Sequence, residues 1–396
     1  MINKESREKV LVVDTYSQKS LHEMFNASLF LMCSMIFKKV ELRISKSSYE
    51  NYLKIINRES PKNIEYNNVW VIAGNGRFSL LIRYLFSALQ NIKYLIISPK
   101  DTVLVFPYNN LFSLRVLNFL NKFCKKKILV FCHGEMEGIV VDVEKTGFLH
   151  RLLLKLARDF FLNKKVKISE GLYFSVLGDA LKQNISEIVD DGKALKFISV
   201  DHPYLFGGGI KKIKDDAELR IATVGTINKT KGFFSFLEFA KKINSTIKEK
   251  VKISIVGSCT ENSNLFNGSG IELSSNSSAL LNRDDFNNRV NELDYILFFY
   301  PKNSYNITAS GAIMDAINFE KPILALKNAY FQYVFKKYGS FGFLFENIND
   351  MVLKVEDLSN NKSLPNIDFI SLKNKFTPEA LSTQLLNELF RIGFLE

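Results

Sequence analysis

The segment Asp294–Lys327, DYILFFYPKNSYNITASGAIMDAINFEKPILALK, decides the fold of this chain. Its hydrophobic pattern predicts four elements in order: a buried strand over Tyr295–Phe299, a loop without acidic residues over Pro301–Ala309, a helix that begins at Ser310 and Gly311, and a second strand over Pro322–Leu326. We therefore expect the N-terminus of this helix to point out of the carboxyl end of a strand.

That helix N-terminus is a candidate phosphate site, because a first turn has unpaired backbone N–H groups and a partial charge of about half a unit. Gly311 would let a ligand approach the backbone, and Thr308 and Ser310 offer hydroxyl groups. Asp315, one turn into the helix, would reach a ribose or sugar hydroxyl. Alternatively, Ser310 is only an N-cap and Asp315 only an acid favoured by the helix dipole. The segment alone leaves both interpretations open.

The composition is that of a globular protein with two or three domains, because 396 residues exceed one ordinary core and 46% of them are hydrophobic. The four cysteines have no CxxC spacing and no histidine cluster, so we expect neither disulfides nor a zinc site. The start, MINKESREKV, does not resemble a signal peptide. The longest nearly apolar run, Ala27–Phe37, is shorter than the roughly 20 residues that cross a bilayer. We expect a cytoplasmic protein without a transmembrane helix.

The net charge of +12 predicts an acidic partner, which could be nucleic acid, anionic lipid or a phosphorylated substrate. Nucleic acid ranks last, because the sequence has no nucleic-acid motif of definite spacing. The stretch Phe148–Lys167 has the pattern of a basic amphipathic helix, which can lie on an anionic membrane surface. The alternative is a helix that packs its apolar face on a sheet and leaves its charges in water.

Short apolar runs separated by helical stretches predict parallel sheets covered on both faces. We expect strands in the first half at Lys9–Asp14, Val40–Ile44, Val69–Ala73, Tyr94–Ser98, Val103–Phe106, Ile128–Cys132, Leu172–Leu177 and Lys196–Ser199, and in the second half also at Leu219–Val224 and Val251–Val256. The glycine-rich, charged stretch Asp201–Asp216 is typical of a linker. The predicted organisation is an N-terminal domain over 1–205, a linker over 206–218, a C-terminal domain over 219–375, and a helix over 376–396 that could dock across both.

Two predicted strands of the first half end in candidate site loops. The glycines of Trp70–Gly76, WVIAGNG, could admit a ligand, although a tight turn is favoured. In Ile128–Gly138, ILVFCHGEMEG, the side chains of His133, Glu135 and Glu137 follow the carboxyl end of a strand, where open α/β sheets bind ligands. The alternative for this loop is a solvated surface turn.

Three segments of the second half resemble the donor-nucleotide domain of a GT-B glycosyltransferase: VGTINKTKG at Val224–Gly232, ISIVG ending at Gly257, and ASGAIMDAINFEKPILA at Ala309–Ala325. The resemblance implies two Rossmann-like domains whose parallel sheets face one another across a cleft. It also implies that Gly225 and Lys231 face the donor diphosphate, that Asp315 binds the ribose, and that His133 lies near the transferred sugar.

The chain departs from that family at two positions. Thr226, which we place in the donor site, stands where the family commonly has Arg. Ile307 lies eight residues before Asp315, where retaining members have a second glutamate. The sequence therefore leaves open whether the reaction inverts or retains the sugar configuration.

The chemistry of sugar transfer can be assigned to residues without a metal or a cofactor. Lys231 and the amides of Ser310 and Gly311 would stabilise a leaving diphosphate. We expect Glu135 to be the general base of an inverting reaction, with His133 second and Asp14 a weaker candidate. A metal-dependent alternative would use Asp142 and Glu144, and we disfavour it.

These expectations define a glycosyltransferase that moves a sugar from a nucleotide-sugar donor to a saccharide acceptor. A lipid-linked acceptor of bacterial surface polysaccharide synthesis would explain the basic charge, because such an enzyme works at the inner face of the plasma membrane. The alternatives are a nucleotide-sugar epimerase on the same fold and a non-catalytic two-lobed binding protein. The sequence does not identify the sugar, the base or the acceptor.

Overall fold

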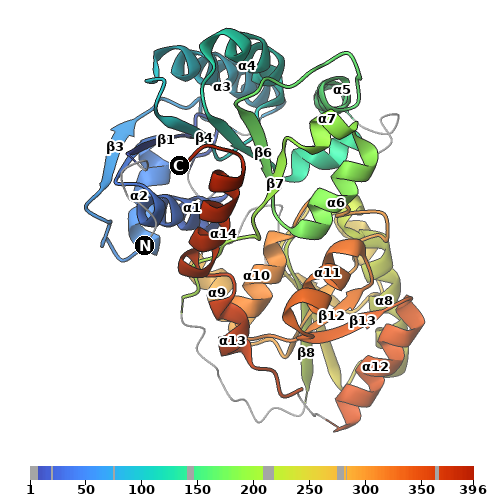
Figure 1. The fold of residues 1–396 in the computed structure, drawn as a ribbon. Coiled ribbons are helices and arrows are strands. Elements are labelled where there is room, and N and C mark those ends of the chain that lie inside the picture. Colours follow the sequence, from blue (N-terminus) through green and yellow to red (C-terminus); the bar gives the residue numbers. More distant parts are fainter. Residues whose placement is uncertain are drawn as a thin grey trace. The chain divides into compact units, whose positions relative to one another are not determined.

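The structure, a computed structural model, describes residues 8–18, 21–74, 76–140, 147–207, 218–273, 281, 283–361 and 365–396 (Figure 1). Its contacts divide the chain into an N-terminal unit, Met1–Leu205 with Ile307–Ala309 and Phe376–Glu396, and a C-terminal unit, Phe206–Asn306 with Ser310–Lys375. Most of the predicted linker, residues 208–217, lies outside the described residues.

The N-terminal unit contains a seven-stranded parallel sheet in the order β3-β2-β1-β4-β5-β6-β7. Val10 in the middle strand pairs with Val40 on one side and Val103 on the other. The strands are β1 (Lys9–Val13), β2 (Lys39–Ile44), β3 (Ile64–Asn68), β4 (Val103–Phe106), β5 (Ile128–Phe131), β6 (Leu172–Val176) and β7 (Phe197–Ser199).

Helices cover both faces of this sheet, because right-handed crossovers to the left and to the right of β1 place their helices on opposite sides. One group packs together as α1, α2 and α14, and the other as α3, α4 and α5 (Figure 1). The helices of the unit are α1 (Glu23–Ile36), α2 (Lys46–Ile55), α3 (Arg77–Ile97), α4 (Leu111–Cys124), α5 (Phe148–Phe161), α6 (Asp179–Ile188), α7 (Asp191–Ala194), α14 (Pro378–Arg391) and the 3-10 turn η2 (Gly134–Ile139).

The C-terminal unit contains a six-stranded parallel sheet in the order β10-β9-β8-β11-β12-β13. The strands are β8 (Leu219–Ile227), β9 (Val251–Cys259), β10 (Ile271–Leu273), β11 (Tyr295–Phe298), β12 (Ile323–Leu326) and β13 (Gly342–Phe345). The helices are α8 (Phe233–Thr246), α9 (Arg283–Asn291), α10 (Gly311–Asn318), α11 (Ala329–Tyr338), α12 (Ile348–Asn361), α13 (Phe369–Asn374) and the 3-10 turns η4 (Lys229–Lys231) and η5 (Ser263–Phe266). Two Rossmann-like parallel sheets confirm the predicted fold class.

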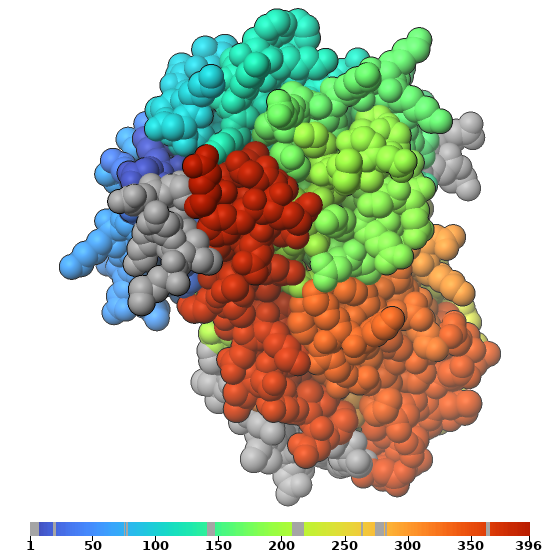
Figure 2. Space-filling model, in the orientation of Figure 1, coloured from blue at the N-terminus to red at the C-terminus, as the bar shows by residue number. Residues whose placement is uncertain are grey.

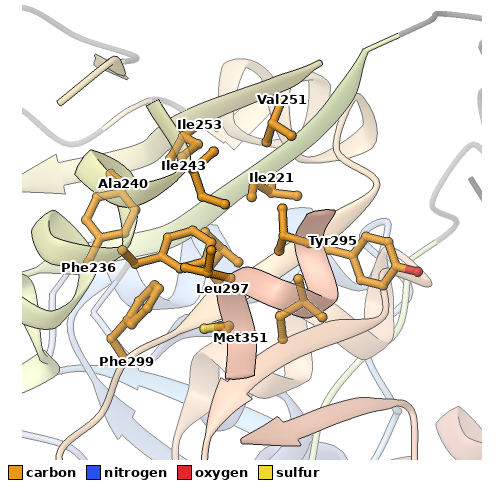
Figure 3. Close-up of a cluster of buried hydrophobic side chains, with 14 of the residues drawn as sticks. Ile221, Phe236, Ala240, Ile243, Val251, Ile253, Tyr295, Leu297, Phe299 and Met351 are labelled. Carbon is orange, nitrogen blue, oxygen red and sulfur yellow. The ribbon is translucent and has the colours of Figure 1, made fainter. Parts of the chain in front are cut away.

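One hydrophobic cluster of the C-terminal unit lies between its sheet and the helices α8 and α12 (Figure 3). Phe236 of α8 and Met351 of α12 are fully buried against Leu297 and Phe299 at β11. Burial of each such side chain contributes about 1.5–3 kcal/mol to stability. The strand β11, on which the sequence analysis began, is therefore stabilised by its packing against α8 and α12.

Two predicted strands of the first half are wrong. Tyr94–Ser98 is the end of α3 and its cap, because a short apolar run has no period that separates strand from buried helix. Val69–Ala73 follows β3 without being a strand itself. The carbonyls of Ile72 and Gly74 instead accept hydrogen bonds from the Arg83 guanidinium, 2.7 Å from Nε in the case of Ile72.

The expectation that no helix could cross a membrane needs a correction. Residues Phe78–Ile97 of α3 are long and apolar enough by length and composition, and they are the one such stretch within the described residues. The sequence analysis missed it because Arg83, Asn91 and Lys93 interrupt the apolar run. Arg83 and Asn91 are buried within the unit, so α3 is a helix of the N-terminal sheet layer.

The C-terminal helix α14 belongs to the N-terminal unit, where it packs against α1 and β7. Figure 2 shows it in red at the surface of this unit. Side-chain bonds fix it there: Gln384 accepts from the Asp201 amide at 2.9 Å, and Lys127 donates to the Phe394 carbonyl at 2.9 Å. Thr377 caps the helix by accepting from the Ala380 amide, and Pro378 occupies its first turn.

We predict that Gly232→Ala destabilises the protein more than Gly225→Ala. Both glycines have positive φ, 82° and 77°, which costs an alanine about 1–2 kcal/mol. A Cβ on Gly232 would also lie 1.8 Å from the Phe299 carbonyl oxygen, whereas one on Gly225 would meet no atom within 4 Å. Urea unfolding of both variants measures the difference, and equal losses of stability would contradict this packing.

Candidate functional site

The strand order changes direction once in each sheet, between β1 and β4 in the N-terminal unit and between β8 and β11 in the C-terminal unit. Loops that leave adjacent strands at such a point diverge to opposite faces of the sheet, and the space between them is where open α/β proteins bind ligands. Of the predicted donor residues, Gly225 and Thr226 lie near the end of β8, Lys231 follows β8, and the others follow β11. The predicted base follows β5, the neighbour of β4.

The carboxyl end of β8 is held tightly against β9. Gly257 of β9 has φ 146°, and a Cβ there would lie 2.1 Å from the Gly225 carbonyl oxygen, so the two strands approach closely. Thr226 Oγ1 lies 2.9 Å from Ser258 Oγ. The predicted donor residues Gly225 and Thr226 are thus part of a tight strand pair, and the Thr226 hydroxyl already has a protein partner.

Lys231 ends the short turn η4, which Asn228 caps by accepting from the Lys231 amide at 3.0 Å. Its side chain is half-buried, and burial lowers the pKa of its ammonium. None of the described residues forms an ion pair or hydrogen bond with this ammonium. The neighbouring Lys229 is exposed and lies 4.0 Å from Glu261. Lys231 is therefore a partly desolvated cation without an anionic partner among the described residues.

The helix α10 begins as predicted at Ser310 and Gly311. Ser310 stands at the N-cap position, but its hydroxyl lies 3.1 Å from the Tyr300 hydroxyl, and no described side chain caps the helix. Gly311 is exposed, so the first-turn amides are approachable. Ser310 is therefore the N-cap residue by position, as the alternative interpretation had it, but its side chain makes no capping bond with the described residues.

The other two predicted donor residues have different surroundings. Asp315 is half-buried, and its Oδ1 lies 3.7 Å from Nη2 of Arg283, so its carboxylate faces a guanidinium. Thr308 is buried, and its contacts group it with the N-terminal unit. Asp315 therefore shares the C-terminal unit with Lys231 and Ser310, and Thr308 does not.

His133 follows β5 and is buried. Its Nε2 lies 2.9 Å from the Pro107 carbonyl, which can only accept, so Nε2 carries the proton and Nδ1 has a free electron pair. Burial lowers the pKa of His133 well below its ordinary value, and the nearby His22 and His202 lower it further. The ring is therefore neutral and can accept a hydrogen bond through Nδ1.

Glu135 lies two residues further, on the turn η2, together with Glu137. Its carboxylate oxygens accept from the His133 amide, each at 3.0 Å. Burial raises the pKa of Glu135 to about 7, and hydrogen bonds from His133 and Asn109 oppose that rise. A carboxylate that changes protonation near neutral pH has the property required of a general base.

Asp14, the weaker base candidate, has a structural position instead. Its buried carboxylate accepts from the amides of Tyr16 and Ser17 and from the Asn26 side chain, at 2.8–3.0 Å. These three bonds shape the turn that joins β1 to α1. The metal alternative, Asp142 with Glu144, lies outside the described residues, and within these no cluster of three His, Cys, Asp or Glu could hold a metal.

Sequence reasoning missed the aromatic residues around His133. Tyr16 after β1 stacks on Tyr108 after β4, with ring centroids 4.4 Å apart, and His22 lies 4.6 Å from His133. Tyr84 of α3 completes the group by a 2.8 Å contact between its hydroxyl and that of Tyr108. The signal was their place at strand ends, but only the strand order shows that β1 and β4 are neighbours.

No protein-family model matches the sequence, and no curated protein matches it. Solved structures are similar to it in three dimensions. TarM matches over 98% of each chain, with a TM-score of 0.62 and 11% identity. A point mutant of S. aureus TarM in complex with Fondaparinux, alpha-GlcNAc-glycerol and UDP matches over 76% of this chain, with a TM-score of 0.53 and 14% identity, and this chain spans 58% of its length.

Two further solved structures match nearly the whole chain. Anabaena HepE in complex with UDP-glucose matches over 97% of this chain and 99% of its own, with a TM-score of 0.61 and 11% identity. WaaG, described as a glycosyltransferase involved in lipopolysaccharide biosynthesis, matches over 96% and 99%, with a TM-score of 0.55 and 12% identity. The chain therefore has the two-domain GT-B fold of these proteins, as the sequence resemblance predicted.

We predict that Glu135→Gln changes how stability depends on pH. The folded state keeps the Glu135 proton up to about pH 7, whereas an unfolded chain releases it near the ordinary pKa of 4.5. The folded state thus binds more protons between these values, and its stability falls as pH rises through them. The Tm of the variant should rise relative to wild type across this window and level off above it.

Glu187→Gln on α6 is the matched control, because Glu187 is exposed. The pH-dependent change in Tm of Glu135→Gln relative to wild type should exceed that of this control. A Tm difference for Glu135→Gln that depends on pH no more than that of the control would mean that Glu135 ionises in the folded protein as it does in water.

Proposed function

We propose that this protein is a glycosyltransferase that moves a sugar from a nucleotide-sugar donor to a saccharide acceptor. The observation that carries the proposal is that two groups follow the strands at the switch point of the C-terminal sheet: the half-buried Lys231, whose ammonium has no partner among the described residues, and the N-terminus of α10, which no described side chain caps. The loops that bear them leave the adjacent strands β8 and β11. The GT-B fold supports the same class of reaction.

The donor diphosphate fits this pair of groups. A diphosphate brings two negative charges, which would pair with the Lys231 ammonium and accept hydrogen bonds from the first-turn amides at Gly311. Each charge-assisted bond contributes about 1.5–3 kcal/mol. The bonds strengthen as the sugar–oxygen bond breaks and negative charge gathers on the leaving diphosphate. In this proposal the charge is neutralised without a metal and no cofactor takes part.

The transfer itself needs a base that accepts the proton of the attacking hydroxyl. We assign that role to Glu135, whose raised pKa suits proton transfer at neutral pH. The acceptor oxygen bonds to the anomeric carbon, the bond from that carbon to the diphosphate oxygen breaks, and the proton passes to Glu135. His133, neutral and with Nδ1 unprotonated, would accept a hydrogen bond from a sugar hydroxyl and orient it.

The acceptor that we propose is a lipid-linked saccharide in bacterial surface polysaccharide synthesis, and the protein would work in the cytoplasm at the inner face of the membrane. The basic charge of +12 supports an anionic surface. WaaG, which has the same fold, is described as acting in lipopolysaccharide biosynthesis.

A non-catalytic nucleotide-sugar binding protein is the second candidate, because Thr226 replaces a family arginine and its hydroxyl contacts Ser258. The two candidates differ in one measurement. A transferase releases nucleoside diphosphate when donor and acceptor are both present, and a binding protein does not. An epimerase would convert the donor sugar without any acceptor.

We predict that Lys231→Ala weakens donor binding and that Lys229→Ala does not. Losing the ammonium removes about 1.5–3 kcal/mol from binding, which is about 10–100-fold in Kd. Lys229 is the matched control, because it lies on the same turn but is exposed and paired with Glu261. A thermal-shift panel of nucleoside diphosphates and nucleotide sugars without added metal measures both variants.

The panel has clear consequences for the site. A Tm increase with one nucleotide that Lys229→Ala keeps and Lys231→Ala loses would support the assignment. Equal Tm increases in both variants would remove Lys231 from the donor site. No increase with any nucleotide would contradict the proposed function.

We also predict a pH profile for the transfer reaction. Because the base must be ionised, kcat/KM should fall tenfold per pH unit below about pH 7. Glu135→Gln should lower kcat by about 10²–10⁴-fold and leave the donor Kd unchanged. Turnover by Glu135→Gln at the wild-type rate would show that another group takes the proton.

A further inference from the structure

The helix α3 buries a polar stripe together with Ala88, Tyr94 and Leu95, and leaves an apolar stripe exposed. The residues Arg83, Ser87 and Asn91, spaced four apart, are buried with exposed fractions of 1–3%. The residues Phe78, Leu85 and Leu89, spaced seven and four apart, are 45–75% exposed. At 3.6 residues per turn these two stripes lie on opposite sides of the helix. A helix on a soluble sheet normally has the reverse orientation.

The inward polar stripe is fixed by hydrogen bonds to the segments that follow β1, β3 and β4. Thr15, at the end of β1, contacts Ser87 Oγ at 2.7 Å and donates to Asn91 Oδ1 at 2.8 Å. Arg83 donates to the Ile72 carbonyl at 2.7 Å, and Asn110 to Ser87 Oγ at 3.0 Å. Because these buried groups are satisfied only in this orientation, α3 cannot rotate to hide its apolar side.

The outward side of α3 continues onto neighbouring elements. Trp70, 66% exposed, packs edge-on against Phe86 of α3, and Phe119 and Phe123 of α4 are 58% and 72% exposed. The helices α3 and α4 pack side by side (Figure 1). We call Trp70, Phe78, Leu85, Leu89, Phe119 and Phe123 the α3–α4 apolar face. A patch of this kind on a soluble protein indicates a binding surface.

The net positive charge of the segment that contains the α3–α4 apolar face indicates which kind of partner it binds. Between Tyr66 and Gly134 the sequence has nine Lys or Arg residues and a single acid, Asp101. Lys93 on α3 and Arg115 and Lys122 on α4 are exposed and flank the apolar side chains. Arg115 pairs with Asp159 of α5, and the other two have no acid on their own helices. Apolar side chains ringed by cations match an anionic lipid bilayer.

We propose that the α3–α4 apolar face docks on an anionic membrane, with α3 in the plane of the surface and its apolar stripe among the upper acyl chains. The inference rests on the proposed function, because docking would bring the enzyme to a lipid-linked acceptor. Docking itself requires neither donor nor acceptor.

Two other modes of membrane contact fit the structure less well. A transmembrane α3 would have to break the bonds of Arg83, Ser87 and Asn91, and would place a guanidinium in the bilayer. The helix α5, which the sequence suggested as the membrane helix, buries the apolar residues Leu154, Phe160 and Phe161 within the unit. The charges of α5 are available to a surface, but most of its apolar side is not.

Trp70 provides a direct probe, because it is the only tryptophan of the chain. Its emission should shift to the blue when full-length protein is mixed with phosphatidylcholine vesicles containing phosphatidylglycerol. Brominated acyl chains should quench it, and added salt should reverse both effects. Unchanged emission and no quenching would overturn the proposal.

Vesicle co-sedimentation of variants tests which residues dock. Leu85→Gln/Leu89→Gln should lower the partition coefficient by at least about tenfold, since Gln preserves helix propensity and removes apolar contact. Leu353→Gln/Ile370→Gln is the matched control, because these residues of the C-terminal unit are 63% and 71% exposed. Lys93→Gln/Lys122→Gln should reduce binding to anionic vesicles and leave binding to neutral vesicles unchanged. Equal partition of the Leu85/Leu89 variant and its control would overturn the proposal.

Two further outcomes would also overturn it. Membrane-bound protein that resists both high salt and alkaline carbonate would be integral, with α3 across the bilayer. A dimer in solution that Leu85→Gln/Leu89→Gln converts to monomer, with no vesicle binding by wild type, would show that a second copy covers the face.

Thermal shifts with nucleotide sugars on the same variants separate this inference from the proposed function. Retained donor binding with no vesicle binding rejects the docking alone. Vesicle binding without any nucleotide binding rejects the proposed function alone and leaves the docking face in place.

Discussion

The backbone of the loop after β8 packs directly against the backbone at the end of β11, and this contact constrains the structure of the C-terminal unit. A Cβ on Gly232 would lie 1.8 Å from the Phe299 carbonyl oxygen, so the backbone there admits only glycine. The contact fixes where α8 begins, and with it the turn that ends at Lys231. Because β8 and β11 are the neighbours at which the strand order reverses, the same contact sets the geometry of the switch point. The anion site that we propose depends on this packing before it depends on any charge.

Lys231 differs from other buried or half-buried lysines in the partners of its ammonium group. Lys126 is buried and donates to the last carbonyls of α3, and Lys321 donates to the carbonyls of Asn291 and Leu293. Lys193 is buried with Asp190 and the Asn163 carbonyl as partners. In each case the cost of removing an ammonium from water is offset by protein acceptors. The Lys231 ammonium is partly removed from water but has no such acceptor among the described residues. A cation in this environment favours the binding of an anionic ligand.

Much of the fold could be predicted from the sequence, because parallel strands buried on both faces are short continuous runs of Val, Ile and Leu. The runs at β1, β5 and β11 are unambiguous for this reason. The run Tyr94–Ser98 was misread because a buried helix end has the same composition. β13 was not predicted at all, since Gly342–Phe345 is short and begins with glycine. For the candidate site, the sequence located the loops of His133, Lys231 and Ser310, but the aromatic group of Tyr16, Tyr84 and Tyr108 needed the strand order.

The orientation of α3 could not be predicted for a more general reason. Periodicity shows that a helix has an apolar side and a polar side, and the usual inference buries the apolar one. In α3 that inference fails, because the segments that follow β1, β3 and β4 present Thr15, the Ile72 carbonyl and Asn110 to it, which are polar groups that need partners. Satisfying them turns the polar side inward, and the apolar side is left at the surface. The direction of an amphipathic helix is thus set by what lies beneath it, and an exposed apolar stripe that results from buried hydrogen bonds is a fixed feature of the fold on which a binding surface can be built.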